Sequence, residues 1–286
     1  MNREIRDALI FIFPLFFFVT IFLFLPVLGT FWVSLWHDVS FLPGRFVGLF
    51  NYLRLFKDNQ FWQSTIFTLL FSLTSVALEL ALGVIIALVV NERLRFRGLV
   101  RGIALLPWAI PSVIGARIWQ LIYKYDYGVL NYTLQKLFGV SVNWLGTGTG
   151  AFLSLVMADV WRTTPFVAVI FLAGLQTVPE ELYQQAKIDG TNFLQRFFKI
   201  TVPMIKPIFV VALLFRTIDA LRVFDVIYII TGGGPAGSTD SISLYSYKYF
   251  ALSDFGYGSA ISVSLFIIAF ASALIFMRMS RFKEVV

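Results

Sequence analysis

The sequence has no cysteine and one histidine, His37. The missing thiols exclude disulfide bonds, thiol catalysis and thiolate metal sites, and a single imidazole excludes a metal centre built from several histidines. Charged residues are scarce as well: they make up 14% of the 286 residues, whereas a soluble chain has about 25%. We therefore expect no catalytic residue, no metal site and no soluble domain.

The chain is instead rich in long apolar runs, since 58% of its residues are hydrophobic. A bilayer core needs about 20 apolar helical residues. The stretches that meet this length are Ala8–Trp36, Phe61–Val90, Gly102–Tyr123, Gly150–Val178, Pro207–Ile230 and Phe255–Met277. We predict an all-α polytopic membrane protein with six transmembrane helices.

The first apolar run could also be a signal peptide, because basic residues precede it. Its uncharged stretch exceeds the roughly 7 to 15 apolar residues that a signal peptide has. We interpret it as a retained span that is broken or bent near Pro14 or Pro26. Residues 1–60 then form an N-terminal helix with its outer loop, and residues 61–286 form a five-helix core.

The positions of Lys and Arg predict the orientation. The N-terminus, the 91–101 and 179–206 connectors and the C-terminus hold 13 of the 23 basic residues, and the other three connectors hold six. Basic connectors stay in the cytoplasm, so both termini should be cytoplasmic. The net charge of +7 follows from this pattern, and we expect no nucleic-acid partner. Each outer connector has fewer than 30 residues, so a separate protein must capture any substrate.

Charges inside the spans are the candidate functional residues, because each costs roughly 2.5 to 3.5 kcal/mol at the centre of a membrane helix. Asp159, Arg162, Thr163 and Phe166 share one helix face, and Arg216, Asp219, Arg222 and Asp225 follow each other at i, i+3 spacing at a similar depth. A carboxylate, a guanidinium and an aromatic ring suit a polyhydroxylated ligand. Our substrate-path candidates are Asp159, Arg162, Phe166, Arg216, Asp219 and Arg222.

Two other roles are open for these charges: ion pairs that hold helices together, and side chains that reach the membrane surface. For Asp225 and Arg117 these roles are at least as good an explanation. Glu79 lies alone in its span, and we interpret it as a structural polar contact.

The connector 179–206 predicts two short helices. Pro179 suits a helix start, Glu180 and Glu181 suit its first turn, and Gly190 suits its end. An amphipathic helix follows, which we expect Pro203 and Pro207 to end before the fifth span.

At these residues the sequence resembles the membrane permeases of ATP-binding-cassette importers. Gly190, Ile200 and Pro203 hold the spacing of the cytoplasmic EAA loop of that family, and Gln184, Gln185 and Ala186 stand at its Glu-Ala-Ala. The segments PFVAVIFLAGLQTVPEELY and FDVIYIITGGGPAGST are similar to the carbohydrate permeases of maltose, trehalose and glycerol-phosphate type.

The resemblance implies a type I importer fold and one permease subunit of a sugar importer in a bacterial or archaeal cytoplasmic membrane. It also implies a second homologous permease, two ATPase subunits that hold ATP and Mg²⁺, and an extracytoplasmic sugar-binding protein. The implied coupling residues are Glu181, Gln184, Ala186, Asp189 and Gly190, and Gly233, Gly234 and Pro235 would dock the binding protein.

Two other functions remain as alternatives. In an ion-gradient-driven carrier, Asp159, Asp219 and Glu79 would carry protons or sodium, but the long cytoplasmic connector would have no role. A membrane-embedded lipid enzyme would have only carboxylates available for catalysis.

The segment Gly232–Thr239 nearly matches a phosphate-binding loop, but Ser238 replaces its lysine, so we interpret it as a tight glycine turn. The identity of the sugar stays open between a neutral and an acidic or phosphorylated ligand.

Overall fold

The computed structural model describes residues 3–40, 42–92 and 96–280. Contacts divide the chain into two compact units, Met1–Trp62 with Tyr245–Ile267, and Gln63–Leu244 with Ile268–Val286. The helices α4 (Asn59–Asn91) and α14 (Phe255–Ser280) begin in the first unit and continue into the second.

The first unit contains the N-terminal span and a group of short elements at its end, which we call the cap. The span consists of α1 (Arg3–Val19), the π-helix η1 (Thr20–Phe24) and α2 (Leu25–Val33). The cap consists of β1 (Trp36–His37), β2 (Arg45–Phe46), α3 (Phe50–Phe56) and most of α13 (Ile242–Ala251). Within the cap, β1 and β2 form a short antiparallel hairpin, and the Asn51 amide donates to the carbonyl oxygens of Ser34 and Trp36, both at 2.9 Å. The cap is therefore a hydrogen-bonded structure, and its hairpin is a small exception to the all-α prediction.

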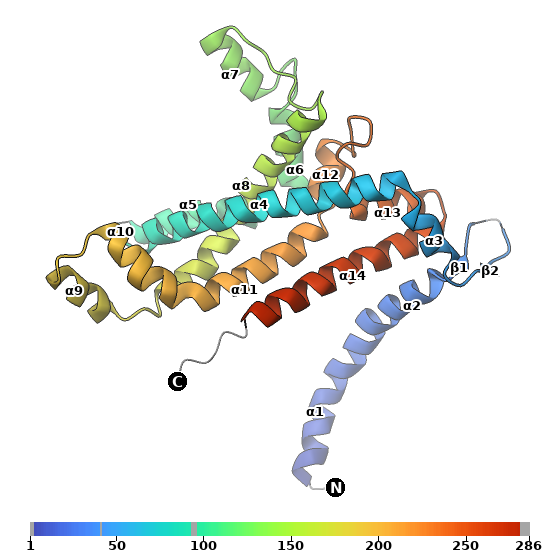
Figure 1. Cartoon of the computed structure of the whole chain (residues 1–286), viewed down its shortest axis with the longest axis horizontal. Coiled ribbons are helices and arrows are strands. Elements are labelled where there is room, and N and C mark those ends of the chain that lie inside the picture. Colours follow the sequence, from blue (N-terminus) through green and yellow to red (C-terminus); the bar gives the residue numbers. More distant parts are fainter. Residues whose placement is uncertain (1–2, 41, 93–95, 281–286) are drawn as a thin grey trace. The chain divides into compact units, whose positions relative to one another are not determined.

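The second unit is a helical bundle around α8. Besides α4 it contains α5 (Arg97–Ala109), α6 (Ser112–Ile122), α7 (Val129–Phe138), α8 (Gly148–Leu175), α9 (Glu180–Ile188), α10 (Phe193–Arg196), the π-helix η2 (Phe197–Thr201), α11 (Val202–Leu221) and α12 (Asp225–Ile230). Figure 1 shows α7 beyond the first residues of α8 and α9 beyond its last. The helix α8 thus connects the two ends of this unit.

Within residues 3–40, 42–92 and 96–280, five helices are long and apolar enough to cross a membrane, and a bent pair would make a sixth span. This agrees with the predicted polytopic helical fold. Four of the basic residues used to predict the orientation, Arg93, Arg95, Arg281 and Lys283, lie outside the described residues.

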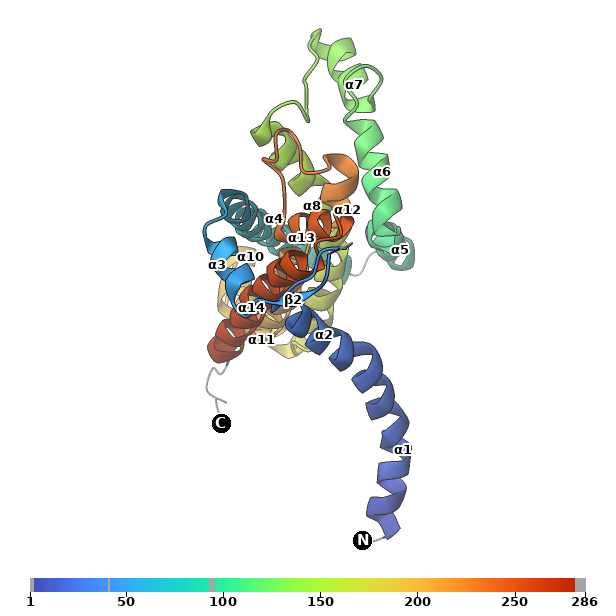
Figure 2. The ribbon, with the colours of Figure 1, turned by 90° about the vertical axis from the view of Figure 1, so that its right-hand side faces the viewer.

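The predicted span Gly102–Tyr123 corresponds to a bent pair of helices rather than to one helix. Two helices, α5 and α6, occupy it, and they meet at 89° (Figure 2). The cause is Pro111, which caps α6: a residue that precedes proline avoids the helical region, and Ile110 is extended with ψ at 130°.

The predicted fifth span also has different limits. We expected Pro203 and Pro207 to end the preceding amphipathic helix, but one helical stretch runs from Phe193 to Leu221. The π-helical turn η2 comes just before Pro203, and at this turn the backbone N–H of Val202 donates to the carbonyl of Phe197, five residues earlier. Such a turn shifts the hydrogen-bond pattern ahead of the prolines, so that they fit in α11. At the other end, the span breaks at Arg222 and resumes as α12.

The first span is a continuous helical stretch, Phe11–Val33. Instead of a break near Pro26, it has the π-helical turn η1 directly before Leu25 and Pro26. Proline in a helix removes one donor, and a local π turn accommodates that loss.

Two glycines allow the central helices to approach closely. A Cβ atom on Gly83 of α4 would lie 2.6 Å from Cγ1 of Val167 in α8, and one on Gly174 of α8 would lie 2.8 Å from Cγ1 of Ile208 in α11. Small residues at such crossings let helix backbones pack tightly in a membrane. Contact of α8 with α4 and α11 therefore depends on these positions.

We predict that Gly83→Ala lowers the thermal midpoint of the purified full chain in detergent. The added methyl group must displace Val167, and overpacking of this kind costs about 1 to 3 kcal/mol. Gly102→Ala in α5 is the matched control, because no atom lies within 4 Å of its added Cβ and alanine favours a helix by up to about 1 kcal/mol. Equal shifts in both variants would contradict the close packing at Gly83.

Candidate functional site

A buried arginine joins three helices of the second unit. The guanidinium of Arg216 in α11 contacts the Glu79 carboxylate of α4 through Nε at 2.5 Å and Nη2 at 2.9 Å. The same Nη2 lies 3.5 Å from Oδ2 of Asp159 in α8. Glu79, Arg216 and Asp159 expose only 0, 2 and 3% of their surface. Charges can be buried this deeply only when opposite charges and hydrogen bonds surround them.

The hydroxyl of Thr163 strengthens this centre. It lies 2.6 Å from Oε1 of Glu79 and 2.6 Å from the backbone carbonyl of Asp159. Because Glu79 also receives two bonds from Arg216, its carboxylate is well satisfied although it lies deep in an apolar helix.

The ion-pair network becomes more exposed away from Arg216. Arg216 also contacts Asp219, Arg222 lies 3.4 Å from Asp219, and Arg162 lies 3.9 Å from Asp159. The side chains of Arg162, Asp219 and Arg222 are 22, 48 and 69% exposed. Three arginines and three carboxylates thus balance each other, and the outer members offer a ligand the most exposed surface.

A cavity of about 400 Å³ opens beside the exposed part of the network. Its lining includes Arg162, Phe166, Arg216, Asp219 and Arg222, together with Trp108, Thr163, Phe215 and Ile218. The structure therefore brings five of the six substrate-path candidates to one cavity, and Asp159 lies behind them, paired with Arg216.

An aromatic pair forms another part of the cavity lining. The ring of Trp108 in α5 stacks on Phe166 of α8, with 5.6 Å between the ring centroids and 28° between the planes. Near these rings, Nε of Arg162 is buried without a hydrogen-bond partner among the described residues. Flat apolar rings beside charged donors and acceptors can hold a ligand that has both apolar faces and hydroxyl groups.

The sequence left one partner and one lining residue unassigned. Glu79 was interpreted as a structural polar contact, and the structure confirms this, but its partner Arg216 was not assigned. A signal existed, because a buried carboxylate in an apolar span needs a cation from another helix. Trp108 was not singled out, and its place in the cavity depends on the bend between α5 and α6.

Two further charges do not join the network. The predicted i, i+3 series ends at Arg222, because α11 stops there and Asp225 starts α12, where its carboxylate accepts a hydrogen bond from Ser112. Arg117 donates to Gln120 at 2.6 Å on an exposed face. For both residues the structure shows polar contacts outside the cavity.

A second candidate site is the short helix α9. The predicted start and end are confirmed: Pro179 caps the helix, Glu180 and Glu181 lie in its first turn, and Gly190 follows the C-cap Asp189 with φ at +73°. Only Ala186 is buried, and the Tyr183 hydroxyl bonds to that of Thr201 at 2.9 Å. One side of α9 is therefore anchored, while Glu181, Gln184 and Asp189 are exposed.

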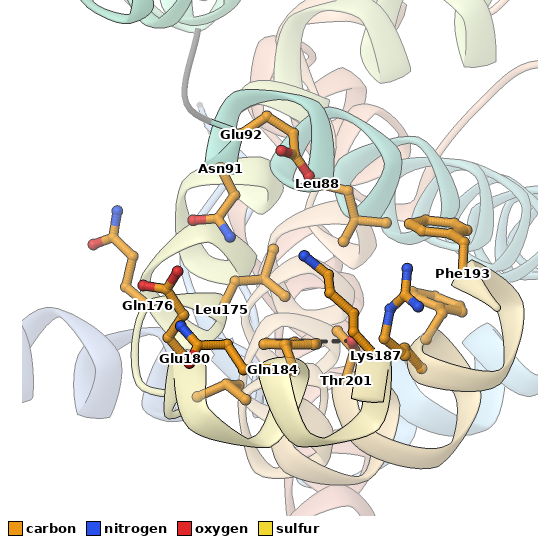
Figure 3. A pocket seen from close by; sticks show the side chains of 14 residues that line it. Leu88, Asn91, Glu92, Leu175, Gln176, Glu180, Gln184, Lys187, Phe193 and Thr201 are labelled. Carbon is orange, nitrogen blue, oxygen red and sulfur yellow. Dashed lines mark hydrogen bonds between the residues drawn. The ribbon is translucent and has the colours of Figure 1, made fainter. Parts of the chain in front are cut away.

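A polar cavity of about 420 Å³ lies between α9 and the end of α4. Figure 3 shows Lys187 of α9 reaching toward Leu88 and Asn91 of α4. The lining also includes Glu92, Glu180, Gln184 and Arg196. This side of α9 faces the cavity, so the helix is attached to the bundle mainly through Tyr183 and Ala186.

The predicted glycine turn follows α12. The Thr239 side chain donates to the carbonyl of Gly234 at 2.6 Å, and its backbone N–H donates to that of Gly233 at 3.2 Å. Gly233 has φ at +91°, which a residue with a side chain rarely adopts. Gly233 is buried and Gly234 and Pro235 are half-buried, whereas the neighbouring Ala236 and Ser238 are exposed.

The family and the two relatives that this chain matches are membrane components of transport systems. The model of the family described as "Binding-protein-dependent transport system inner membrane component" matches residues 79–283. The chain is 51% identical to the trehalose/maltose transport system permease protein MalF of Thermococcus litoralis, over 99% of this chain and 96% of that protein. It is 38% identical to the sulfoquinovosyl glycerol transport system permease protein SmoG of Agrobacterium fabrum, over 86% of this chain and 80% of that protein.

A solved structure is similar over nearly the whole chain. It is the crystal structure of a bacterial alginate ABC transporter in complex with an alginate pentasaccharide-bound periplasmic protein. The TM-score is 0.85 with 25% identity, and the match covers 96% of this chain and 95% of that chain. The helical fold of this chain thus exists in a solved transporter.

We predict that Arg216→Gln destabilises the full chain by about 3 to 5 kcal/mol, because it leaves two carboxylates buried without their cation. Adding Glu79→Gln should recover part of this loss, since it removes one of the unpaired charges. Arg222→Gln, whose side chain is 69% exposed, should change stability by less than about 1 kcal/mol. Thermal unfolding in detergent measures all three variants, and an Arg216 variant as stable as the Arg222 variant would contradict the buried centre.

Proposed function

The chain belongs to the family of binding-protein-dependent transport system inner membrane components, and from this premise we propose that it forms half of the translocation pathway of a sugar importer. ATP hydrolysis on partner subunits would drive the movement. This chain would itself catalyse no covalent reaction, in line with relatives that are transport permeases.

The cavity beside Arg216 is the main structural support for a sugar substrate. Trp108 and Phe166 provide a stacked aromatic surface, while Asp219 and Arg222 present an acceptor and donors that remain exposed. Sugars have apolar ring faces and polar edges, and such a combination of groups suits both. The relatives whose names mention trehalose, maltose and sulfoquinovosyl glycerol support a carbohydrate.

The helix α9 is our candidate for coupling to an ATPase. A docking helix needs exposed side chains on one side and firm attachment on the other, and α9 has both: Glu181, Gln184 and Asp189 are exposed, and Ala186 is buried. Gly190 ends the helix in a left-handed conformation, which fixes where the chain turns back.

The remaining partners are proposed from the family. They are a second homologous permease, two ATPase subunits that bind ATP and Mg²⁺, and an extracytoplasmic sugar-binding protein. The turn at Gly233, Gly234 and Pro235 would dock the binding protein through its exposed neighbours, because Gly233 is buried. The solved alginate transporter, which was crystallised with a periplasmic protein, supports a partner of this kind.

We place the chain in a bacterial or archaeal cytoplasmic membrane with both termini in the cytoplasm. The distribution of Lys and Arg supports this orientation. The alternative, an ion-gradient-driven carrier, needs carboxylates that can take up and release a cation. Glu79, Asp159 and Asp219 each contact an arginine instead, so the network does not favour that function.

The first test concerns the cavity. Arg222→Gln should raise the sugar concentration for half-maximal uptake by about tenfold, because an exposed donor to the ligand is lost while the fold is kept. Uptake of labelled trehalose or maltose into proteoliposomes that contain the assembled complex measures this. Arg117→Gln, which removes an exposed arginine outside the cavity, is the matched control. If both variants transport like the unmodified complex, the cavity is not the substrate path.

The second test concerns α9. Gly190→Val should lower the ATPase rate that the sugar-loaded binding protein stimulates by about fivefold or more, because a β-branched residue is strained at φ of +73°. Gly190→Asn should keep most of the rate, since asparagine tolerates this conformation. Size-exclusion chromatography checks that both complexes assemble. Equal rates in the two assembled variants would show that the end of α9 has no part in coupling.

A further inference from the structure

The helix α3, in the cap of the first unit, has apolar side chains on its exposed surface. The N-cap residue Leu49 is 67% exposed, and Phe50, Leu53 and Phe56 within the helix are 57, 61 and 61% exposed. Its inner side is firmly held, because Leu55 is completely buried and Asn51 bonds to two backbone carbonyls. An exposed apolar surface on a well-anchored helix indicates contact with another apolar phase.

The position of α3 along the spans identifies that phase. Asn51 donates to the carbonyl of Ser34, the residue after α2, and Arg54 lies 3.6 Å from Asp254, the residue before α14. Both α2 and the first part of α14 belong to stretches that are long and apolar enough to cross a membrane. The helix α3 therefore lies at the ends of these spans, where hydrocarbon gives way to lipid headgroups.

A cavity of about 600 Å³ opens beside α3. Its lining is Phe50, Leu53, Arg54, Lys57, Asp58, Tyr249 and Tyr257. The guanidinium of Arg54 lies 4.1 Å from the ring centroid of Tyr257, so that the side chain is held in place although it is 46% exposed. Lys57 is exposed and has no ion-pair partner among the described residues.

The charged groups that can still bind a ligand in this cavity are donors. The cavity has one carboxylate, that of Asp58. It already accepts hydrogen bonds from the hydroxyls of Tyr245 at 2.5 Å and Tyr257 at 2.7 Å, and from the backbone N–H groups of Gln60 and Phe61. Burial raises the pKa of Asp58, but these four bonds outweigh it and hold the pKa below its usual value. The carboxylate is saturated, so a ligand must accept from Arg54 and Lys57 rather than donate to Asp58.

We propose that this cavity binds the phosphodiester of a membrane phospholipid, which Arg54 and Lys57 hold while the exposed apolar residues of α3 contact its acyl chains. A phosphodiester accepts hydrogen bonds without donating any, which matches the open donors. Guanidinium and ammonium groups are the usual partners of phosphate. The lipid would fix the cap of the first unit at the membrane surface.

Native mass spectrometry of the full chain in detergent tests this, with phosphatidylglycerol as the probe. Lys57→Gln should weaken binding of the lipid about fivefold, and Lys57→Glu should weaken it further, since one basic residue near a membrane surface contributes about this factor. Lys57→Arg should bind like the unmodified chain. Lys136→Gln, which removes an exposed lysine on α7, is the matched control and should have no effect.

Two further probes separate the lipid from other ligands. Diacylglycerol with the same acyl chains lacks the phosphate and should not compete with phosphatidylglycerol, and soluble glycerol phosphate lacks the chains and should compete only weakly. Effective competition by glycerol phosphate would replace the lipid with a free anion. Equal binding of phosphatidylglycerol to the Lys57 series and to the control would overturn the proposal.

Discussion

The arrangement of the helical bundle depends on the burial of Arg216. A guanidinium in an apolar helix is tolerated only where carboxylates meet it, and here they come from two other helices, Glu79 from α4 and Asp159 from α8. Each helix must therefore turn one particular side chain toward α11 at one particular depth. The close approaches at Gly83 and Gly174 bring the same helices together by shape. Charge and packing thus define one register for α4, α8 and α11.

The same network explains why its members have different roles. Near Arg216 the charges are buried and paired, and they form contacts between helices. Farther out, Asp219 and Arg222 are exposed and line a cavity with Phe166 and Trp108. A structural role and a ligand-binding role were alternatives for these charges as a group. In the structure the two roles are compatible, since burial divides the group into a rigid base and an accessible surface.

How far the sequence could predict the fold depends on the range of the interaction. Local signals predicted the spans, the limits of α9 from Pro179 and Gly190, and the shared face of Arg162 and Phe166. Partners distant in sequence were not accessible, so Glu79 was not assigned to Arg216. Proline was ambiguous: Pro111 ends a helix and produces the 89° bend, whereas Pro203 and Pro207 lie in a continuous helix after a π turn. Tertiary packing decides between these outcomes, and a residue pattern does not contain it.

The proposed docking helix α9 is physically connected to the cavity. A short linker joins α9 to the end of α8, and Tyr183 joins it to Thr201, just before α11. The cavity residues Arg162 and Phe166 stand on α8, and Asp219 and Arg222 stand on or directly after α11. From Leu175 to Arg162 is a rise of about 20 Å along one helix. A displacement of α9 would thus act on two walls of the cavity through two rigid helices, and rigid elements of this kind are among the structures that carry coupling between distant sites.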